Sequence, residues 1–180
     1  MRKTVTSLLS TALFFAAMTD SSPTYAAGLR YGCDTATGRY SPVDIPLTAS
    51  QLTFSGTMRP ALFRYDPKWI PTAFVRINDS NKQSITIRLV AKNSKASAAD
   101  ATVVVQDGED RKTAVVGAIP LDTAMRFSIS YGENDDIAIV VNGKKTSLSN
   151  KLDDDITLSL VCSTGDFVFD EIAWSTSPTE

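Results

Sequence analysis

Apolar and polar residues alternate with a period of two through most of the chain after residue 50. In residues 84–92, Ile85, Ile87 and Leu89 fall on one face. Thr86 and Arg88 fall on the opposite face. This period predicts half-buried β-strands, because successive side chains of a strand point to opposite faces. Other segments with this alternation or with short apolar runs are residues 51–58, 101–106, 113–119, 125–131, 137–141, 156–163 and 167–174.

Turn sequences separate these strands. Asn142-Gly143 follows an apolar run and tolerates the positive φ angles of a type I′ turn, which predicts a tight hairpin. The polar residues 107–110 predict a second hairpin, and residues 163–166 a turn between the last two strands. Residues 94–101 could form a two-turn helix or a surface loop. About ten strands with short turns predict an all-β antiparallel sandwich.

The first 26 residues have the order of a secretory signal peptide. Arg2 and Lys3 precede an apolar stretch over residues 8–18, and the small residues Ala26 and Ala27 follow. The apolar stretch is shorter than the roughly 18 residues that a spanning helix needs, so we expect no permanent membrane anchor. We predict cleavage after Ala26, a single β-sandwich domain over residues 27–175, a flexible tail at 176–180, and a periplasmic or secreted location.

Residues 58–71 interrupt the alternation with Pro60, Pro67 and Pro71. Proline cannot donate a ladder hydrogen bond, so this segment is expected to be a long loop or an irregular sheet edge. It could serve as a cover for one end of the core, with Leu62, Phe63 and Ile70 turned inward and the charged residues outside.

The same segment also has the composition of a ligand-binding loop. Aromatic faces stack on sugar rings, and arginine grips carboxylates or sulfates with two parallel hydrogen bonds. The candidate ligand-binding residues are Arg59, Arg64, Tyr65, Lys68 and Trp69. A binding site for an acidic glycan and a core cover are both consistent with the pattern.

Composition excludes several classes of function. The chain has 18 Lys+Arg, 20 Asp+Glu and no His, for a net charge of −2. Without a basic excess, nucleic acid is not an expected partner. Without histidine, the commonest zinc ligand and the side chain best suited to proton transfer near neutral pH are missing. The two cysteines, Cys33 and Cys162, would reach an oxidising compartment and are predicted to form a disulfide.

The segment from Met125 to Trp174 resembles the concanavalin A-like jelly-roll superfamily of lectins, laminin G-like modules, glucanases and alginate lyases. The resemblance rests on residues 126–131, on residues 139–144 with their Asn-Gly, and on the aromatic closing strand 165–174. It implies a two-sheet jelly-roll sandwich. The alternating carboxylates of the family 16 glucanases and the Gln-x-His strand of the alginate lyases are not found in this sequence.

No constellation of residues predicts catalysis or a metal centre. Asp170 and Glu171 are adjacent in a predicted strand, so they should point to opposite faces and cannot form a glycosidase pair. The acidic runs 134–136 and 153–155 are candidate calcium ligands, although turn formation explains them as well. We expect no cofactor.

These arguments favour an exported, non-catalytic binding domain for a carbohydrate or cell-envelope glycan. The alternatives are a periplasmic module that binds an envelope protein, as an assembly factor or inhibitor, and a polysaccharide hydrolase or lyase that works without histidine.

Overall fold

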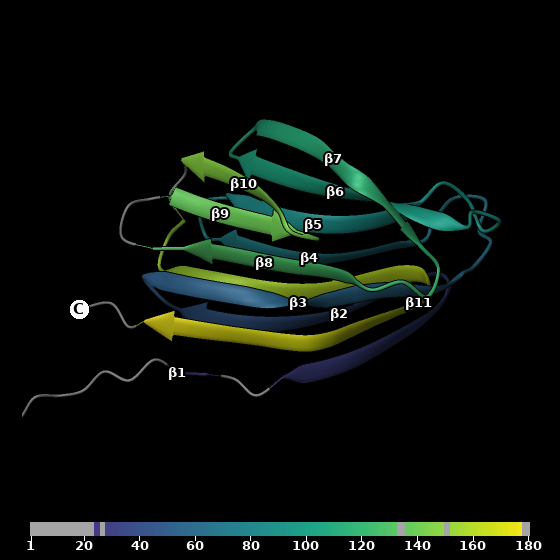
Figure 1. Ribbon diagram of the computed structural model, residues 1–180, viewed down its shortest axis with the longest axis horizontal. Coiled ribbons are helices and arrows are strands. Elements are labelled where there is room, and N and C mark those ends of the chain that lie inside the picture. The colour runs from purple at the N-terminus through teal and green to yellow at the C-terminus, as the bar shows by residue number, and fades with distance from the viewer. Residues whose placement is uncertain (1–23, 26–27, 133–135, 150–151, 178–180) are drawn as a thin grey trace, which may run out of the picture.

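The computed structural model describes residues 24–25, 28–132, 136–149 and 152–177, and Figure 1 shows the arrangement of the strands. The strands are β1 (Thr24–Tyr25), β2 (Leu29–Thr48), β3 (Gln51–Phe63), β4 (Thr72–Asp79), β5 (Ser84–Ala91), β6 (Ala98–Asp107), β7 (Asp110–Pro120), β8 (Met125–Tyr131), β9 (Asp136–Val141), β10 (Lys144–Ser149) and β11 (Asp155–Ser177). All of their pairings are antiparallel. The described part of the chain contains no helix, and therefore none that could cross a membrane.

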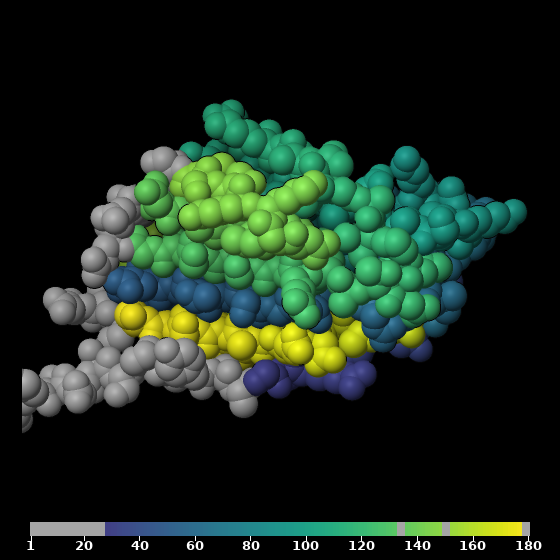
Figure 2. Space-filling view, viewed as in Figure 1, coloured from purple at the N-terminus to yellow at the C-terminus, as the bar shows by residue number. Residues whose placement is uncertain are grey.

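Two sheets form the sandwich, and β2 and β11 run through both of them. Residues 155–163 of β11 pair with residues 41–48 of β2 on one side and with β4 on the other. The first sheet therefore has the order β2-β11-β4-β5-β6-β7. Residues 165–177 of β11 pair with β3, and the second sheet continues through β8 and β9 to β10. The outer face of this second sheet is the surface seen in Figure 2.

β2 and β11 cross from one sheet to the other side by side, each through a bend. Gly38 has φ +70° and Thr164 has φ +55°, which are bends that an ordinary strand does not make. The Gly38 amide donates to the Thr164 hydroxyl over 3.3 Å, so the two bends are joined. The predicted turn at residues 163–166 is therefore wrong: the segments 156–163 and 167–174 belong to one bent strand, β11.

Around Pro60 the second interpretation, an irregular sheet edge, is confirmed, because residues up to Phe63 belong to β3 while its pairing with β8 ends at Met58. β3 pairs Pro60 with Phe167 and Leu62 with Asp166, so one residue of β3 is extra at that point and forms a bulge. On the other side, β8 ends its pairing at Met58. Proline is tolerated there because no neighbouring strand needs its missing N–H. The loop comprises only residues 64–71.

Of the other local predictions, some are confirmed and some are wrong. Asn142 (φ +47°) and Gly143 (φ +81°) form the predicted hairpin turn between β9 and β10. Residues 107–110 connect β6 and β7, as predicted. The short helix at 94–101 is absent, since β6 already begins at Ala98. β11 runs to Ser177, so the first two residues of the expected tail are paired with β3, and residues 178–180 lie outside the described residues.

The core fills the space between the sheets. It is built from the inward members of each alternating strand, as in β4, where Ala73, Val75 and Ile77 are fully buried. The largest fully buried side chains are Phe54, Phe167, Phe169, Leu52, Met58, Ile77, Ile85, Ile87, Leu89, Met125, Ile129 and Ile137.

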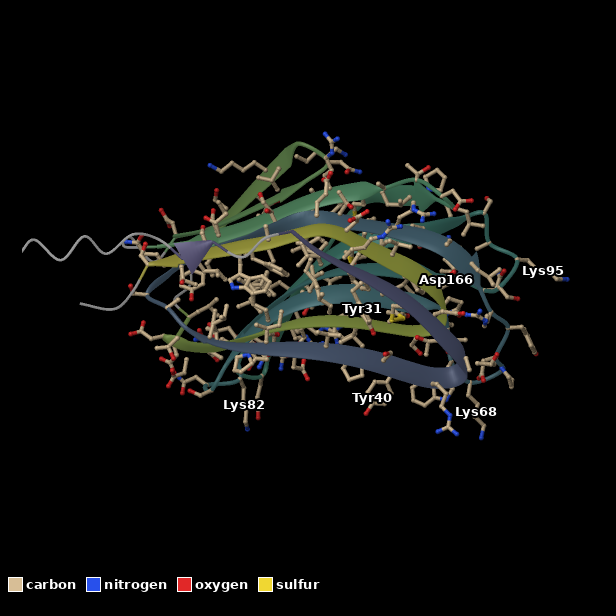
Figure 3. The ribbon with its side chains drawn as sticks, turned by 90° about the horizontal axis from the view of Figure 1, so that it is seen from below. Tyr31, Tyr40, Lys68, Lys82, Lys95 and Asp166 are labelled. Atoms are coloured by element: carbon tan, nitrogen blue, oxygen red, sulfur yellow. A yellow bond between two sulfur atoms is a disulfide. The ribbon has the colours of Figure 1, made fainter. Side chains whose placement is uncertain are left out.

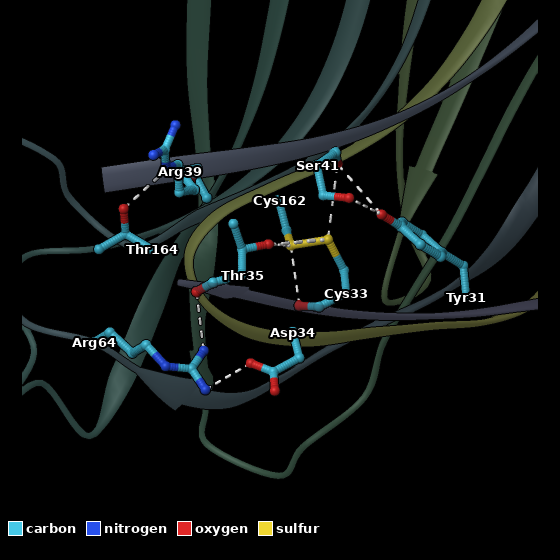
Figure 4. The surroundings of a disulfide bond; sticks show 10 residues. Tyr31, Cys33, Asp34, Thr35, Arg39, Ser41, Arg64, Cys162 and Thr164 are labelled. Carbon is cyan, nitrogen blue, oxygen red and sulfur yellow. Dashed lines mark hydrogen bonds and ion pairs between the residues drawn. A yellow bond between two sulfur atoms is a disulfide. The ribbon is translucent and has the colours of Figure 1, made fainter. Parts of the chain in front are cut away.

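The predicted disulfide between Cys33 and Cys162 is present, with the two Cα atoms 6.2 Å apart (Figure 4). Cys33 belongs to the part of β2 in the second sheet, and Cys162 to the part of β11 in the first sheet. The bridge therefore links the two sheets beside the bends. The Thr35 hydroxyl lies 2.8 Å from the Cys162 sulfur, and Tyr31 and Ser41 share a 2.7 Å hydrogen bond between the two parts of β2.

Candidate functional site

The outer face of the first sheet carries a groove of about 730 Å³ between β2, β11, β4 and the loop 64–71. The register explains which side chains reach it, since outward positions of neighbouring strands face one another in rows. One row runs Asp44, Ser159, Arg76, Thr86, and the next runs Pro42, Val161, Phe74, Arg88. The groove is lined by Gly38, Arg39, Tyr40, Pro42, Asp44, Lys68, Trp69, Ile70, Thr72, Phe74, Arg76, Ser159, Val161 and Ser163.

Three aromatic side chains define the groove. Trp69 is 57% exposed and Tyr40 72% exposed, and Tyr40 projects outward near Lys68 beside the bend of β2 (Figure 3). Phe74 is half-buried on the sheet itself, and the Arg76 guanidinium carbon lies 4.7 Å from the centre of its ring. Aromatic rings gathered at an open groove with a few polar groups are typical of a ligand-binding site.

The chain around Trp69 is held in place by hydrogen bonds. The Asp66 carboxylate accepts the backbone amides of Lys68 (2.7 Å) and Trp69 (2.8 Å), which closes a tight turn. Trp69 also lies against the bend of β2: a Cβ added at Gly38 would be 3.6 Å from the Trp69 ring and 3.1 Å from Asp66 Oδ2. The bend that joins the two sheets therefore also supports the tryptophan at the groove.

Arginines continue the site across the sheet. A smaller hollow of about 180 Å³ shares Thr72, Phe74 and Arg76 with the groove and adds Arg88 and Arg111. Arg76 donates through Nε to the Thr86 hydroxyl (3.1 Å), and Arg88 donates through Nε to the Thr102 hydroxyl (3.4 Å).

Burial lowers the pKa of both guanidinium groups, Arg76 and Arg88, because desolvation disfavours their charged forms. The positive charge of Arg111 lowers both pKa values further, and Arg88 also acts on Arg76. The negative charge of Asp44 acts in the opposite direction and raises the pKa of Arg76. The face therefore concentrates positive charge.

Two of the five predicted binding residues line the groove, and the other three do not. Lys68 and Trp69 line the groove. Tyr65 is 72% exposed on the same loop but does not line it. Arg59 pairs with Asp122 at 2.8 Å, and Arg64 pairs with Asp34 at 2.6 Å, so both guanidinium groups are engaged elsewhere.

The core-cover interpretation of residues 58–71 holds for one residue that the sequence singled out. Phe63 is buried, whereas Leu62 and Ile70 are about half exposed, at 48% and 52%. The loop therefore closes little of the core, and most of its apolar surface remains accessible.

Sequence reasoning missed most of the groove. Tyr40 lies in β2 and Phe74 and Arg76 in β4, and neither strand was predicted. For β4 the signal was available, since Ala73, Val75 and Ile77 alternate with Thr72, Phe74 and Arg76. Assembling these side chains with Arg88 requires the strand order, which the sequence does not contain.

Carboxylates are scarce at the site. Among the described residues that line the groove and the smaller hollow, Asp44 is the only acid, so no pair of carboxylates flanks a bound polymer there. Asp170 and Glu171 lie on the second sheet at a bulge, where Glu171 has φ +53°. The predicted strict alternation of these two side chains therefore fails locally, and Asp170 lies 3.8 Å from Arg30.

The acidic run 153–155 has structural partners. Asp79 accepts the backbone amides of Asn81, Gln83 and Asp153, and Asp153 accepts from Ser80 and Asn81. In the part of the chain that is described, no group of three or more potential metal ligands is close enough to hold an ion. Residues 134 and 135 lie outside the described residues.

No protein-family model matches the sequence, and no curated protein matches it. Solved structures do match the fold. The CBM2 module of Lactobacillus casei BL23 phage J-1 evolved Dit has a TM-score of 0.53 at 9% identity, covering 82% of this chain and 74% of that one. The carbohydrate recognition domain of Emp46p in its potassium-bound form has a TM-score of 0.54 at 9% identity, covering 86% and 90%.

The β-glucanase of Bacillus licheniformis has a TM-score of 0.51 at 9% identity, covering 83% of this chain and 78% of the enzyme. At these identities the likeness concerns architecture alone. It extends over most of the chain, well beyond the segment from Met125 to Trp174 that carries the resemblance in sequence. This protein therefore has a two-sheet antiparallel jelly-roll fold, similar to that of these solved structures.

Proposed function

We propose that this protein is an exported carbohydrate-binding domain whose ligand, a cell-envelope or extracellular glycan, lies in the groove of the first sheet. The observation that carries the proposal is Trp69, an exposed ring held at the edge of an open groove by the Asp66 turn and by Gly38. A flat apolar ring fixed in this way can stack on a sugar ring while neighbouring polar groups bind its hydroxyls.

Binding without cleavage fits the groove better than hydrolysis does. Glycoside hydrolysis needs two carboxylates about 5–10 Å apart across the scissile bond, and the groove offers Asp44 alone among its described lining residues. Asp44 is moreover occupied as the acceptor of a 2.6 Å hydrogen bond from Ser159.

Export is supported by the disulfide. Disulfides persist in oxidising compartments such as the periplasm or the cell exterior, and both sulfurs here are buried and bridged. The predicted signal peptide falls largely on residues 1–23, which lie outside the described residues. Cleavage after Ala26 would also remove β1, which contributes only two residue pairs to β11.

The proposal is tested by glycan binding of Trp69→Ala beside Tyr65→Ala. The two residues share a loop and are both exposed, but only Trp69 lines the groove. Trp69→Ala should weaken retention of the glycans selected on an array by about tenfold or more, because truncating an aromatic ring that stacks on the ligand has a cost of about 1–2 kcal/mol or more. Tyr65→Ala should bind like the wild type, and both variants should keep its thermal midpoint.

Equal loss in the two variants, or no loss in Trp69→Ala, would place the ligand elsewhere. Incubation of each bound polymer with the wild-type protein, followed by viscometry, tests for cleavage. A fall in viscosity would replace the binding proposal with a lyase or hydrolase function.

A further inference from the structure

The geometry points to a polyanionic glycan, one with carboxylate or sulfate groups on successive sugars, as the ligand of this groove. We infer that Arg76, Arg88 and Arg111 bind its charged groups while Trp69 stacks on a sugar ring. This inference rests on the proposed function and names the chemical class of its ligand.

The three arginines form one cationic stripe on the outer face of the first sheet. Arg88 pairs in register with Phe74, so it is the diagonal neighbour of Arg76 on the adjacent strand. Arg111 lies on β7, in the row of Gln106 and Ser84. All three line the same hollow, which adjoins the groove.

The three arginines of this stripe lack the paired carboxylate that some other arginines of the protein have. Arg30, Arg59 and Arg64 each lie within 4 Å of an aspartate carboxylate. Among the described residues, neither Arg76, Arg88 nor Arg111 forms an ion pair. Asp44 is the one acidic group that offsets the charge at Arg76, and the remaining repulsion among the three arginines would be relieved by a bound anion.

The orientation of the guanidinium groups also suits an anion. Thr86 and Thr102 each accept only the Nε–H of their arginine, on the neighbouring strand in direct register. These bonds fix the plane of each group, and no hydrogen bond within the described structure occupies the terminal nitrogens of Arg76 or Arg88. Terminal nitrogens bind carboxylate or sulfate oxygens in a bidentate manner.

The span of the stripe favours a polymer over a single acid. β4 and β7 are separated by two strands in the sheet order, which is about 14 Å at roughly 4.8 Å per strand. One carboxylate cannot meet cations over that distance, whereas a chain with a charge on each sugar can. Phe74 precedes Arg76 by two residues on β4, and Trp69 lies on the loop before that strand, so the aromatic side chains adjoin the cationic stripe.

The test compares each polymer with a neutral form of the same backbone. Polygalacturonate is measured against its methyl ester, and dextran sulfate against dextran, by affinity electrophoresis at low and high salt. We expect binding to at least one charged polymer, no binding to its neutral counterpart, and weakening by salt, which screens charge contacts. The first pair reports carboxylates and the second reports sulfates.

The variants are Arg88→Gln, Arg88→Lys and Arg126→Gln. Arg88→Gln should lose about tenfold or more in affinity for the charged polymer, as expected for a lost charge-assisted bidentate contact. Arg88→Lys should recover part of it. Arg126→Gln changes the net charge equally but lies on β8 of the second sheet, and it should bind like the wild type. Arg111→Gln on the edge strand β7 repeats the test if Arg88→Gln does not fold.

The outcomes separate the two proposals. Equal binding of charged and neutral polymers, with Arg88→Gln unchanged and Trp69→Ala weakened, would overturn the polyanion inference and leave the proposed function standing. Binding that depends on Arg88 but not on Trp69 would support the inference and contradict the aromatic platform. Failure to bind any of the charged polymers, or displacement of the polymer by a single-stranded oligonucleotide at low concentration, would also overturn the inference.

Discussion

Removal of the Cys33–Cys162 bridge should cost the protein a large part of its stability. The bridge closes a loop with a sequence separation of 129 residues. For a loop of that length the chain-entropy relation gives about 5 kcal/mol at 25 °C as an upper value, and native disulfides contribute about 2–5 kcal/mol. The whole free energy of unfolding of a domain is about 5–15 kcal/mol.

The structure indicates why the loss should be near the upper end. The bridge joins the sheet that contains β4 to the sheet that contains β3, and both cysteines are buried. Among the described strands β2 pairs with β11 alone, so without the bridge the pairing of β2 depends on one neighbouring strand. Alanine at both positions also leaves a small void in the core, which adds to the loss.

The measurement is urea unfolding followed by circular dichroism. It compares the oxidised wild type, the wild type in reductant, and Cys33→Ala/Cys162→Ala. The reduced protein and the double variant should both unfold at lower urea, with a free energy of unfolding about 2–5 kcal/mol below that of the oxidised protein. A double variant within about 1 kcal/mol of the oxidised protein would refute this reasoning, as would alkylation of both thiols after unfolding without reductant.

Three further predictions concern stability, titration and processing. Gly56→Ala should destabilise the protein by about 1–3 kcal/mol in the same urea assay, because the added Cβ would clash with Ile172. Gly32→Ala is the control and should be close to neutral, because a Cβ added there meets no atom within 4 Å. Burial raises the pKa of Tyr131 to about 12, so the unfolded chain ionises first and stability should fall as the pH rises from about 10 to 12; equal stability across that range would contradict the buried phenol. The protein recovered from the envelope should begin at or within one residue of Ala27 by Edman sequencing, and recovery of the chain from the cytoplasm with Met1 intact would contradict export.

The sequence predicts most of the sandwich because its strands are encoded locally. Residues 84–92 alternate so regularly that β5 and its buried face follow directly, and Asn142-Gly143 determines its hairpin through backbone conformation alone. The bend at Thr164 could not be recognised in this way. A polar, glycine-containing segment is typical both of a turn that ends a strand and of a bend within one, and only the pairing with β2 distinguishes them.

The candidate site was predictable only in part for a similar reason. Trp69 could be identified from its own loop, where aromatic and cationic residues follow one another. Arg76 and Arg88 are each an ordinary outward residue on a strand, and their proximity depends on the register between β4 and β5. Arg59 was a plausible ligand residue by type, yet it pairs with Asp122, 63 positions away.

The central position of β11 affects when the chain can fold. β11 is the last described strand in sequence order, and it is the only partner of β2 and one of the two partners of both β3 and β4. During synthesis, neither sheet can be completed before residues 155–177 have been made, because both sheets need their part of this strand. Pairings this distant in sequence are slow to form. Consecutive hairpins such as β4-β5-β6-β7 can pair earlier, but the core between the two sheets should form only after the final strand has been synthesised.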